Sequence, residues 1–355
     1  MPDMSIIDID TPAVLIDIDR VDANLRRVQD YADSHGLALR PHIKTHKLPR
    51  FAQQAIDLGA VGITVQKLGE AEVMADAGIR DIFLPYNIIG LAKLERLRAL
   101  ANRVRIAVTA DSEETVLGLS SAFIDALEPL RVLVECDTGM GRCGVQSPAA
   151  ALALAQMIDA APGLAFGGLM TYPAAGQVEA NAAWLAEARR VLTDAGLPPA
   201  IVSNGGTPDV WRAHEVTAAT EHRPGTYIYL DRFQVAKGVG SFADCALTVL
   251  ATVVSRPTEN RAIIDAGSKA LTSDLLGMDG FGLIEAYPGA VITGLSEEHG
   301  TIDLTNCATR PAIGDKLRII PNHACVVSNL FDTVTLISGD AVVETVPVGA
   351  RGRVD

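Results

Sequence analysis

The sequence has few cysteines, and several other common features are missing from it. Its five cysteines, Cys136, Cys143, Cys245, Cys307 and Cys325, form no CxxC pair and are odd in number, so no disulfide framework is expected. No apolar run approaches the roughly 20 residues that a membrane helix needs. No Lys/Arg block offers the clustered cations that nucleic acid requires. The start, MPDMSIIDID, lacks the plan of a signal peptide. We therefore expect a cytoplasmic protein with no membrane or nucleic-acid partner.

What the chain does contain is apolar sequence and acidic charge. Its 355 residues carry a net charge of −13, from 30 Lys and Arg against 43 Asp and Glu, and 48% of them are apolar. This length suggests one large domain or two ordinary ones, and the apolar fraction is ample for a packed core. These features are most consistent with a globular enzyme.

In the first two-thirds of the chain, short β-branched runs alternate with alanine-rich helical patterns. The candidate strands lie in residues 14–19, 37–44, 61–65, 81–87, 104–110, 131–137, 166–172, 200–206 and, more weakly, 216–223. Such alternation predicts an α/β fold with parallel strands, and eight strands close a (β/α)8 TIM-type barrel. One of the nine candidates must lie outside the barrel, and we expect it to be the first. An open doubly wound sheet is the rival, although no GxGxxG follows a first strand.

The pattern changes near Phe242, where the predicted helices stop. Short β-rich runs such as CALTVLATVVSRP, RAIIDAG, KLRIIPN and TVTLISG are separated by Gly, Pro, Asn and Asp. This pattern of short strands and turn residues predicts an antiparallel β domain of sandwich or barrel type. We therefore expect residues 15–240 to form the barrel and residues 241–355 the C-terminal antiparallel β domain, with the N-terminal segment as a candidate additional strand of the latter.

Lys44 stands out in the segment Arg40–Lys47, RPHIKTHK. It falls at the C-terminal end of the second candidate strand, where the active sites of barrels collect. Burial beside an apolar strand lowers the pKa of a lysine and frees its amine for Schiff-base chemistry with an aldehyde cofactor. The alternative interpretation is a solvated basic loop. His42 and His46 are expected to have structural or supporting roles.

Glycine-rich turns follow three further strands. Asp137–Gly144, DTGMGRCG, combines paired glycines with Arg142, whose guanidinium offers a fixed fork of donors to an oxyanion. Ser203–Thr207 and Arg223–Tyr227 end the last two barrel strands, where backbone N–H groups commonly hold a phosphate. Each of these segments could also be an ordinary turn.

A fourth candidate lies in the β domain, at Pro321–Cys325, PNHAC. In a strand, residues two apart share a face, so His323 and Cys325 are expected to point the same way. Imidazole and thiolate together suit Zn²⁺ or a similar ion, with the remaining positions open to water or substrate. The alternative is a small buried cysteine beside a hydrogen-bonded histidine.

Taken together, these motifs resemble one family over nearly the whole chain, from Thr11 to about Asp332. The matching segments are PHIKTHK, QKLGEAE, DTGMGRCGV, SNGGTP, RPGTYIYLD, DAGSKALTSD, LSEEHG and PNHACVVSNLFD. They resemble the D-threonine aldolase / D-serine dehydratase family of pyridoxal-phosphate enzymes, which have the alanine racemase-like fold. The resemblance implies a barrel with a β domain, and a homodimer.

The resemblance also implies site residues. Pyridoxal phosphate would be attached to Lys44, with Arg142 at its phenolic oxygen and Tyr172 placing a ring nearby. The other predicted cofactor-binding residues are Gln66, Ser203, Asn204, Gly205, Gly206, Arg223, Gly225, Thr226 and Tyr227. The H-x-C or H-x-D metal pair of the family corresponds to His323 and Cys325, for Zn, Mn, Mg or Co. The predicted catalytic residues are Lys44, Tyr172 and His323.

The function implied is a pyridoxal-phosphate- and divalent-metal-dependent lyase that cleaves D-3-hydroxy amino acids to glycine and an aldehyde. The alternatives are a D-serine or 3-hydroxy-D-aspartate dehydratase, giving an α-keto acid and ammonia, and an amino-acid racemase. Cys325 in place of Asp resembles the dehydratases. Arg223 resembles the racemase arginine at the pyridine nitrogen, where a weaker electron sink suits retro-aldol or racemase chemistry. No histidine occurs in PAAGQ after Tyr172, which puts in doubt a base taken from there.

Overall fold

The computed structural model describes residues 5–355, which form two compact units. The barrel unit comprises Arg27–Lys44, Leu48–Gly225 and Arg353–Asp355. The β unit comprises the described residues up to Arg26, together with Thr45–Lys47 and Thr226–Gly352. Helix α1 (Ile18–Ser34) begins in the β unit and ends in the barrel unit. Whether residues 15–240 fold as an independent domain stays a prediction.

Eight parallel strands form the curved sheet of the barrel unit. They are β2 (Ala38–Leu39), β3 (Ile63–Thr64), β4 (Asp81–Asn87), β5 (Arg105–Ala110), β6 (Leu130–Cys136), β7 (Leu164–Thr171), β8 (Ile201–Asn204) and β9 (Glu221–His222). Their order is β2-β9-β8-β7-β6-β5-β4-β3. An isolated parallel bridge between His42 and Thr64 connects the two ends of this order. The eight-stranded barrel is therefore confirmed.

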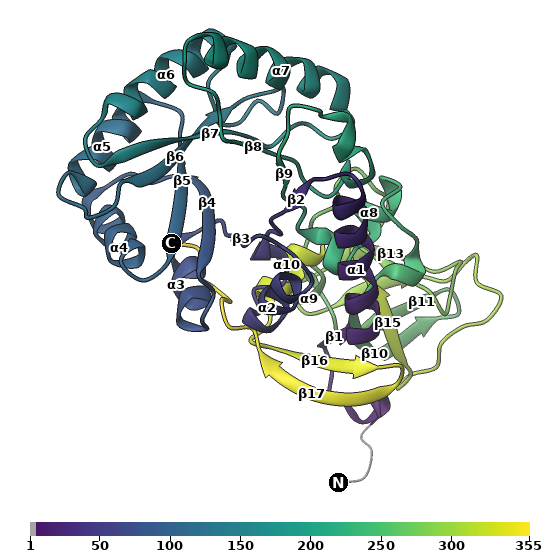
Figure 1. The fold of residues 1–355 in the computed structure, drawn as a ribbon. Helices are drawn as coiled ribbons and strands as arrows, with labels where there is room; N and C mark the ends of the chain where they lie inside the picture. Colours follow the sequence, from purple (N-terminus) through teal and green to yellow (C-terminus); the bar gives the residue numbers. More distant parts are fainter. Residues whose placement is uncertain (1–4) are drawn as a thin grey trace. The chain divides into compact units, whose positions relative to one another are not determined.

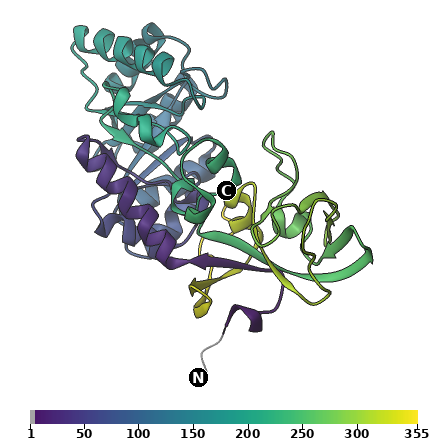
Figure 2. The ribbon, with the colours of Figure 1, turned by 90° about the vertical axis from the view of Figure 1, so that its right-hand side faces the viewer.

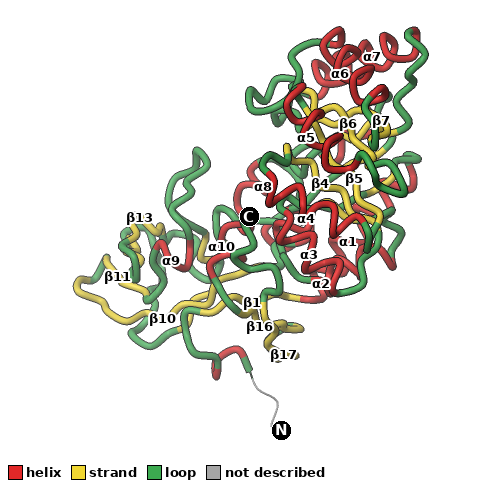
Figure 3. The backbone as a smooth tube through the Cα atoms, turned by 90° about the vertical axis from the view of Figure 1, so that its left-hand side faces the viewer, coloured by secondary structure: helices red, strands yellow, loops and turns green. Residues whose placement is uncertain are grey.

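Helices cover the outer face of this sheet, as Figures 1 and 3 show for α4 to α7. The helices are α2 (Pro49–Asp57), α3 (Leu68–Asp76), α4 (Leu91–Ala101), α5 (Glu113–Phe123), α6 (Pro148–Ala160) and α7 (Val178–Asp194), with the 3-10 helix η3 (Val210–Glu215) after β8. Because both faces of the sheet are covered, a strand such as β6 is buried along nearly its whole length. Ser147 caps α6 and Pro148 opens it, while α7 stops before Gly196 at φ +80°.

The β unit contains a mostly antiparallel sheet. Its strands are β1 (Ala13–Asp17), β10 (Leu247–Thr258), β11 (Arg261–Ile264), β12 (Leu283–Ile284), β13 (Val291–Leu295), β14 (Gly300–Asp303), β15 (Lys316–Ile320), β16 (Thr333–Ser338) and β17 (Ala341–Pro347). β1 pairs antiparallel with the long strand β10 and parallel with β16 (Figure 2). The first candidate strand of the sequence thus lies outside the barrel, as predicted. Leu15, Leu250 and Ile337 form an apolar cluster at this pairing.

Short helices complete the β unit. They are η1 (Ile6–Asp8), η4 (Thr226–Ile228), α8 (Arg232–Ala236), η5 (Phe242–Asp244), α9 (Ser268–Leu271) and α10 (Ala324–Leu330). Among residues 5–355, no helix is both long enough and apolar enough to cross a membrane.

Candidate active site

Lys44 lies in a single helical turn, η2 (Ile43–Thr45), that follows β2. His42 supports this turn, because its Nδ1 accepts a hydrogen bond of 3.3 Å from the backbone N–H of Lys44. With Nδ1 acting as the acceptor, Nε2 donates to Oε1 of Gln66 at 3.0 Å. Gln66 therefore supports the Lys44 turn through His42, and the structure gives His42 the supporting role expected from the sequence.

The ring of Tyr172, the residue after β7, brings three predicted site residues together. Nζ of Lys44 lies 5.8 Å and Cζ of Arg142 lies 5.2 Å from the centroid of this ring. Gly206 approaches the ring so closely that a Cβ at this position would lie 2.8 Å from Cε2 of Tyr172. Residues that follow β2, β6, β7 and β8 thus converge at the carboxyl ends of the strands, where barrel enzymes place their active sites.

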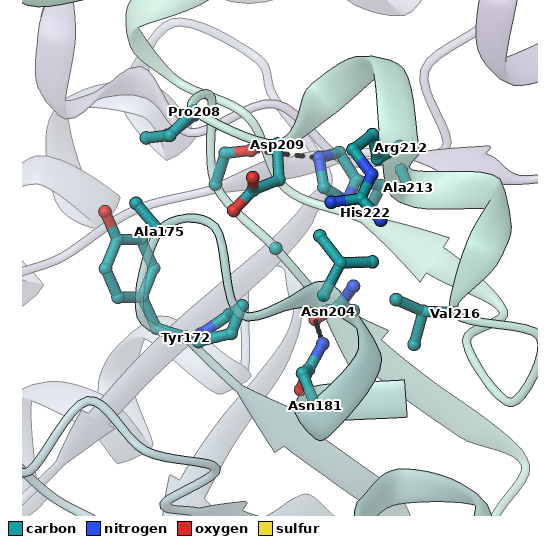
Figure 4. A pocket seen from close by; sticks show the side chains of 14 residues that line it. Tyr172, Ala175, Asn181, Asn204, Pro208, Asp209, Arg212, Ala213, Val216 and His222 are labelled. Carbon is teal, nitrogen blue, oxygen red and sulfur yellow. Dashed lines mark hydrogen bonds between the residues drawn. The ribbon is translucent and has the colours of Figure 1, made fainter. Parts of the chain in front are cut away.

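The turn after β8, Ser203–Thr207, is shaped by two glycines. Gly205 has φ +105°, and a Cβ there would lie 2.0 Å from Cε1 of His222. Nε2 of His222 lies 3.1 Å from the carbonyl oxygen of Gly206, as drawn in Figure 4. Burial, followed by the neighbouring Arg223, lowers the pKa of His222 to about 4. A neutral histidine therefore holds the turn.

Two other residues of this loop, Asn204 and Thr207, make side-chain hydrogen bonds. The Asn204 side chain accepts from Nδ2 of Asn181 at 3.0 Å, on the wall of a cavity that Tyr172 and His222 also line (Figure 4). The N–H of Gly225 donates to Oγ1 of Thr207 at 3.0 Å. Within residues 5–355, the backbone N–H groups of Gly205 and Gly206 donate to no acceptor, which suits the anion site expected there.

Arg223 is buried beneath this loop and is held by hydrogen bonds at both ends of its guanidinium. It donates to Oγ of Ser203 at 2.5 Å and to the carbonyl oxygen of Thr171 at 2.7 Å. Burial lowers its pKa to about 10, although the carboxylates of Glu221 and Glu135 act in the opposite direction. The guanidinium keeps its positive charge near neutral pH. Ser203, a predicted cofactor ligand, is thus a direct partner of Arg223.

The predicted metal pair lies in the β unit, but not in a strand. β15 ends at Ile320, and His323 is the N-cap of α10 with Cys325 in its first turn, so the strand expected here is wrong. Asp231, which follows η4, terminates the strand pattern: its carboxylate accepts from the N–H of Ala324 at 2.9 Å and fixes the backbone between His323 and Cys325.

The imidazole of His323 and the thiol of Cys325 nevertheless shift each other's pKa. Burial lowers the pKa of His323, but hydrogen bonding to Cys325 and Asp274 outweighs this effect and raises the pKa to about 9. Burial raises the pKa of the Cys325 thiol, but the contact with His323 brings it below its usual value. Hydroxyls of Thr45 and Thr226 lie 3.2 and 3.4 Å from Sγ. These contacts favour a thiolate, the form that binds metal.

Two predicted phosphate ligands, Thr226 and Tyr227, belong to the same unit as this pair. The side chain of Thr226 contacts Cys325, a role that the sequence did not indicate. The Tyr227 ring is buried, and burial raises the pKa of its hydroxyl. Among residues 5–355, no group of three or more His, Cys, Asp or Glu could hold a metal ion. His323 and Cys325 would therefore be two protein ligands, with the other positions left to water or substrate.

Three residues at this pair were missed from the sequence: Asp274, Asp231 and Thr45. Asp274 lies 49 residues before its partner His323, and no spacing rule connects the two. Asp231 and Asp274 stand at the ends of the motifs RPGTYIYLD and DAGSKALTSD, and Thr45 follows Lys44. The motifs therefore contained these residues, but they did not indicate which acidic side chain contacts which predicted metal ligand.

The matches to known families cover both units. Residues 16–232 match the family described as alanine racemase, N-terminal domain, and residues 246–337 match the putative serine dehydratase domain. The chain belongs to the family of proteins with the alanine racemase N-terminal domain. Its members are pyridoxal-phosphate-dependent lyases in the branch that this chain resembles, so the prediction of an enzyme of this class is confirmed.

Three relatives match along nearly their whole length. D-threonine aldolase from Arthrobacter sp is 35% identical over 97% of this chain and 93% of the relative. 3-Hydroxy-D-aspartate aldolase from Paracoccus denitrificans is 31% identical, covering 99% and 95%. D-threo-3-hydroxyaspartate dehydratase from Delftia sp. is 32% identical, covering 96% and 97%. Aldolases and a dehydratase thus stand at similar identity.

Solved structures agree with this grouping. D-threonine aldolase from Filomicrobium marinum superposes with a TM-score of 0.90 at 34% identity, covering 99% of each chain. A D-threo-3-hydroxyaspartate dehydratase carrying a cysteine-to-alanine mutation, in the metal-free form, gives 0.88 at 31% identity, covering 96% of this chain and 98% of that one.

Proposed function

We propose that this protein is a pyridoxal-phosphate- and divalent-metal-dependent lyase that cleaves D-3-hydroxy amino acids to glycine and an aldehyde, in the manner of a D-threonine aldolase. The observation that carries the proposal is the convergence of Lys44 and Arg142 on the Tyr172 ring, next to the Gly205–Gly206 turn. A lysine amine, a guanidinium and a glycine turn with available N–H groups are the groups needed to hold an aldehyde cofactor that carries a phosphate.

The residues present fit pyridoxal phosphate. Lys44 would hold its aldehyde carbon, Arg142 its phenolic oxygen, and the N–H groups of Gly205 and Gly206 its phosphate. Arg223 would face the ring nitrogen, and its charged guanidinium would keep that nitrogen unprotonated. When bound, the cofactor supplies an electron sink for negative charge at the substrate Cα. As a free amine, Lys44 could accept or deliver a proton at Nζ beside the Tyr172 ring.

The residues of the second pair fit a divalent metal. Imidazole and thiolate donors suit Zn²⁺ and similar ions, and His323 and Cys325 would hold the ion from one short segment. When bound, the ion supplies Lewis-acid polarisation of the substrate β-hydroxyl. The mutant dehydratase in its metal-free form supports metal dependence in that relative, and we extend it to this chain.

Retro-aldol cleavage is preferred because of Arg223. An unprotonated ring nitrogen would give a weaker electron sink, which suits retro-aldol or racemase chemistry better than chemistry that needs full delocalisation of the charge into the ring. One observation favours the dehydratase alternative: the second metal-ligand position is Cys325, which resembles the dehydratases. The racemase alternative is weaker, because it gives no role to His323 and Cys325. The proposal includes a homodimer in the cytoplasm, as the resemblance and the composition imply.

Product analysis with D-threonine tests the proposal. The holoenzyme with a divalent metal should give glycine and acetaldehyde from D-threonine but not from L-threonine, and Lys44→Ala should give neither. 2-Oxobutanoate and ammonia would show a dehydratase and refute the aldolase assignment. Turnover that persists in His323→Ala with only inversion at Cα would show a racemase. 3-Hydroxy-D-aspartate, tested in parallel, reports the preferred side chain.

A further inference from the structure

Asp274 is the one carboxylate that contacts a predicted metal ligand directly in the described part of the β unit. Its Oδ2 lies 2.7 Å from Nδ1 of His323. A carboxylate is a hydrogen-bond acceptor only, so Nδ1 must carry the proton of this bond. In a neutral imidazole, a proton on Nδ1 leaves the lone pair on Nε2. The contact therefore decides which nitrogen of His323 can bind a metal ion.

Asp274 is itself fixed by contacts that do not involve the imidazole. Its backbone N–H donates to Oγ1 of Thr272 at 3.3 Å. Thr272 ends α9 in the left-handed region at φ +63°, an uncommon conformation for a β-branched residue. From the other side, Nδ2 of the buried Asn322 donates to the carbonyl oxygens of Asp274 at 3.1 Å and Gly280 at 2.8 Å. Asn322 directly precedes His323 in the chain, so it connects the Asp274 segment to the segment that carries His323.

The remaining parts of the pair have other supports. Asp231 holds the N–H of Ala324, and the hydroxyls of Thr45 and Thr226 lie against Sγ of Cys325. None of these residues bonds Nδ1 of His323. Asp274 is consequently the group that sets the rotation and tautomer of the ring, whereas the backbone and the thiolate are held from elsewhere.

We propose that Asp274 is a positioning residue that makes Nε2 of His323 the metal-ligating nitrogen and holds the imidazole ready for the ion. This inference rests on the proposed metal pair and adds to it a third residue that does not touch the metal. Outer partners of this kind contribute about 10–100-fold to metal affinity.

The test measures metal binding rather than turnover. The holoenzyme is stripped with a chelator, and its affinity for Zn²⁺ and Co²⁺ is measured by competition with a chromophoric chelator. Asp274→Ala should bind about 10–100-fold more weakly than wild type. Asp274→Asn should lie between the two, because its amide oxygen still accepts from Nδ1. The matched control is Asp279→Asn, an exposed carboxylate of the same segment, which should bind as wild type does.

A spectroscopic readout separates positioning from general loss of structure. The thiolate-to-Co²⁺ absorption of wild type should shift or lose intensity in Asp274→Ala, while the far-UV circular dichroism stays the same. If Asp274→Ala binds metal as tightly as wild type does, while His323→Ala and Cys325→Ala no longer bind it, the proposed role of Asp274 is wrong and the metal pair stands. Wild-type affinity in His323→Ala would instead refute the metal pair and hence the proposed function.

Discussion

At the scale of single residues, the turn after β8 depends on Gly205, because a neighbouring ring occupies the space that a side chain would need. Gly205 combines φ +105° with a Cβ direction that is filled by the His222 ring. Both constraints oppose any other residue at this position, since backbone strain and steric overlap add to each other.

Gly205→Ala is therefore expected to lower the free energy of unfolding by more than about 2 kcal/mol. The matched control is Gly196→Ala, where φ is +80° but no atom lies within 4 Å of the new Cβ, so that only the left-handed backbone cost of about 1–2 kcal/mol applies. Urea unfolding of the two variants measures the difference. Equal losses would contradict the close packing of His222 against the turn.

Single residues also show how far the sequence could lead. Lys44 and Arg142 come from separate motifs, and the rule that barrel sites collect at the carboxyl ends of strands was enough to expect both there. Tyr172 was expected beside them only from the family resemblance. Asp274 could not be found in this way. Its role depends on the contact with His323 across 49 residues and on the turn that Thr272 and Asn322 hold, and neither leaves a pattern in the sequence.

At the scale of elements, the barrel strands were easier to predict than the metal-pair segment. A barrel strand such as β6 is buried on both faces and reads as a mostly apolar run, so its existence follows from composition. Pro321–Cys325 reads equally well as the end of a strand. Hydrogen bonds from distant residues decide it: Arg232 N–H donates to the Pro321 carbonyl at 3.0 Å, and Asp231 caps Ala324.

The stability of the protein should depend on pH because strand β9 carries the buried His222. Its pKa falls from 6.5 in the unfolded chain to about 4 in the folded one, because the ring is buried. Below pH 6.5, His222 binds a proton in the unfolded state but stays neutral in the folded state. The free energy of unfolding therefore declines as the pH falls from 6.5 towards 4. The loss attributable to His222 is about 3 kcal/mol across this window.

The measurement is the urea-derived free energy of unfolding at pH values from 7 to 4, in wild type and in His222→Gln. The amide of Gln keeps a donor for the Gly206 carbonyl but takes up no proton. The variant should therefore lose less stability than wild type over the window. Parallel curves for the two proteins would show that His222 is not the group responsible.

At the scale of the whole molecule, the chain enters the β unit three times. β1 joins β10 and β16, Thr45–Lys47 belongs to the β unit although both of its neighbours belong to the barrel unit, and the chain returns at Thr226. The first entry was expected from the count of strands. The second rests on contacts between residues far apart in the sequence, such as the hydrogen bond of 2.9 Å from Nζ of Lys47 to Oδ1 of Asn329, and no change in composition marks it.

The most direct test of the proposed function is metal removal from the holoenzyme. Treatment with a chelator should reduce the release of glycine and acetaldehyde from D-threonine to background, and a divalent metal should restore it in wild type but not in His323→Ala. The chelated enzyme should still carry its cofactor on Lys44, which reduction by borohydride and peptide mass analysis would show. Full turnover after chelation, with cofactor retained, would contradict a metal-dependent lyase.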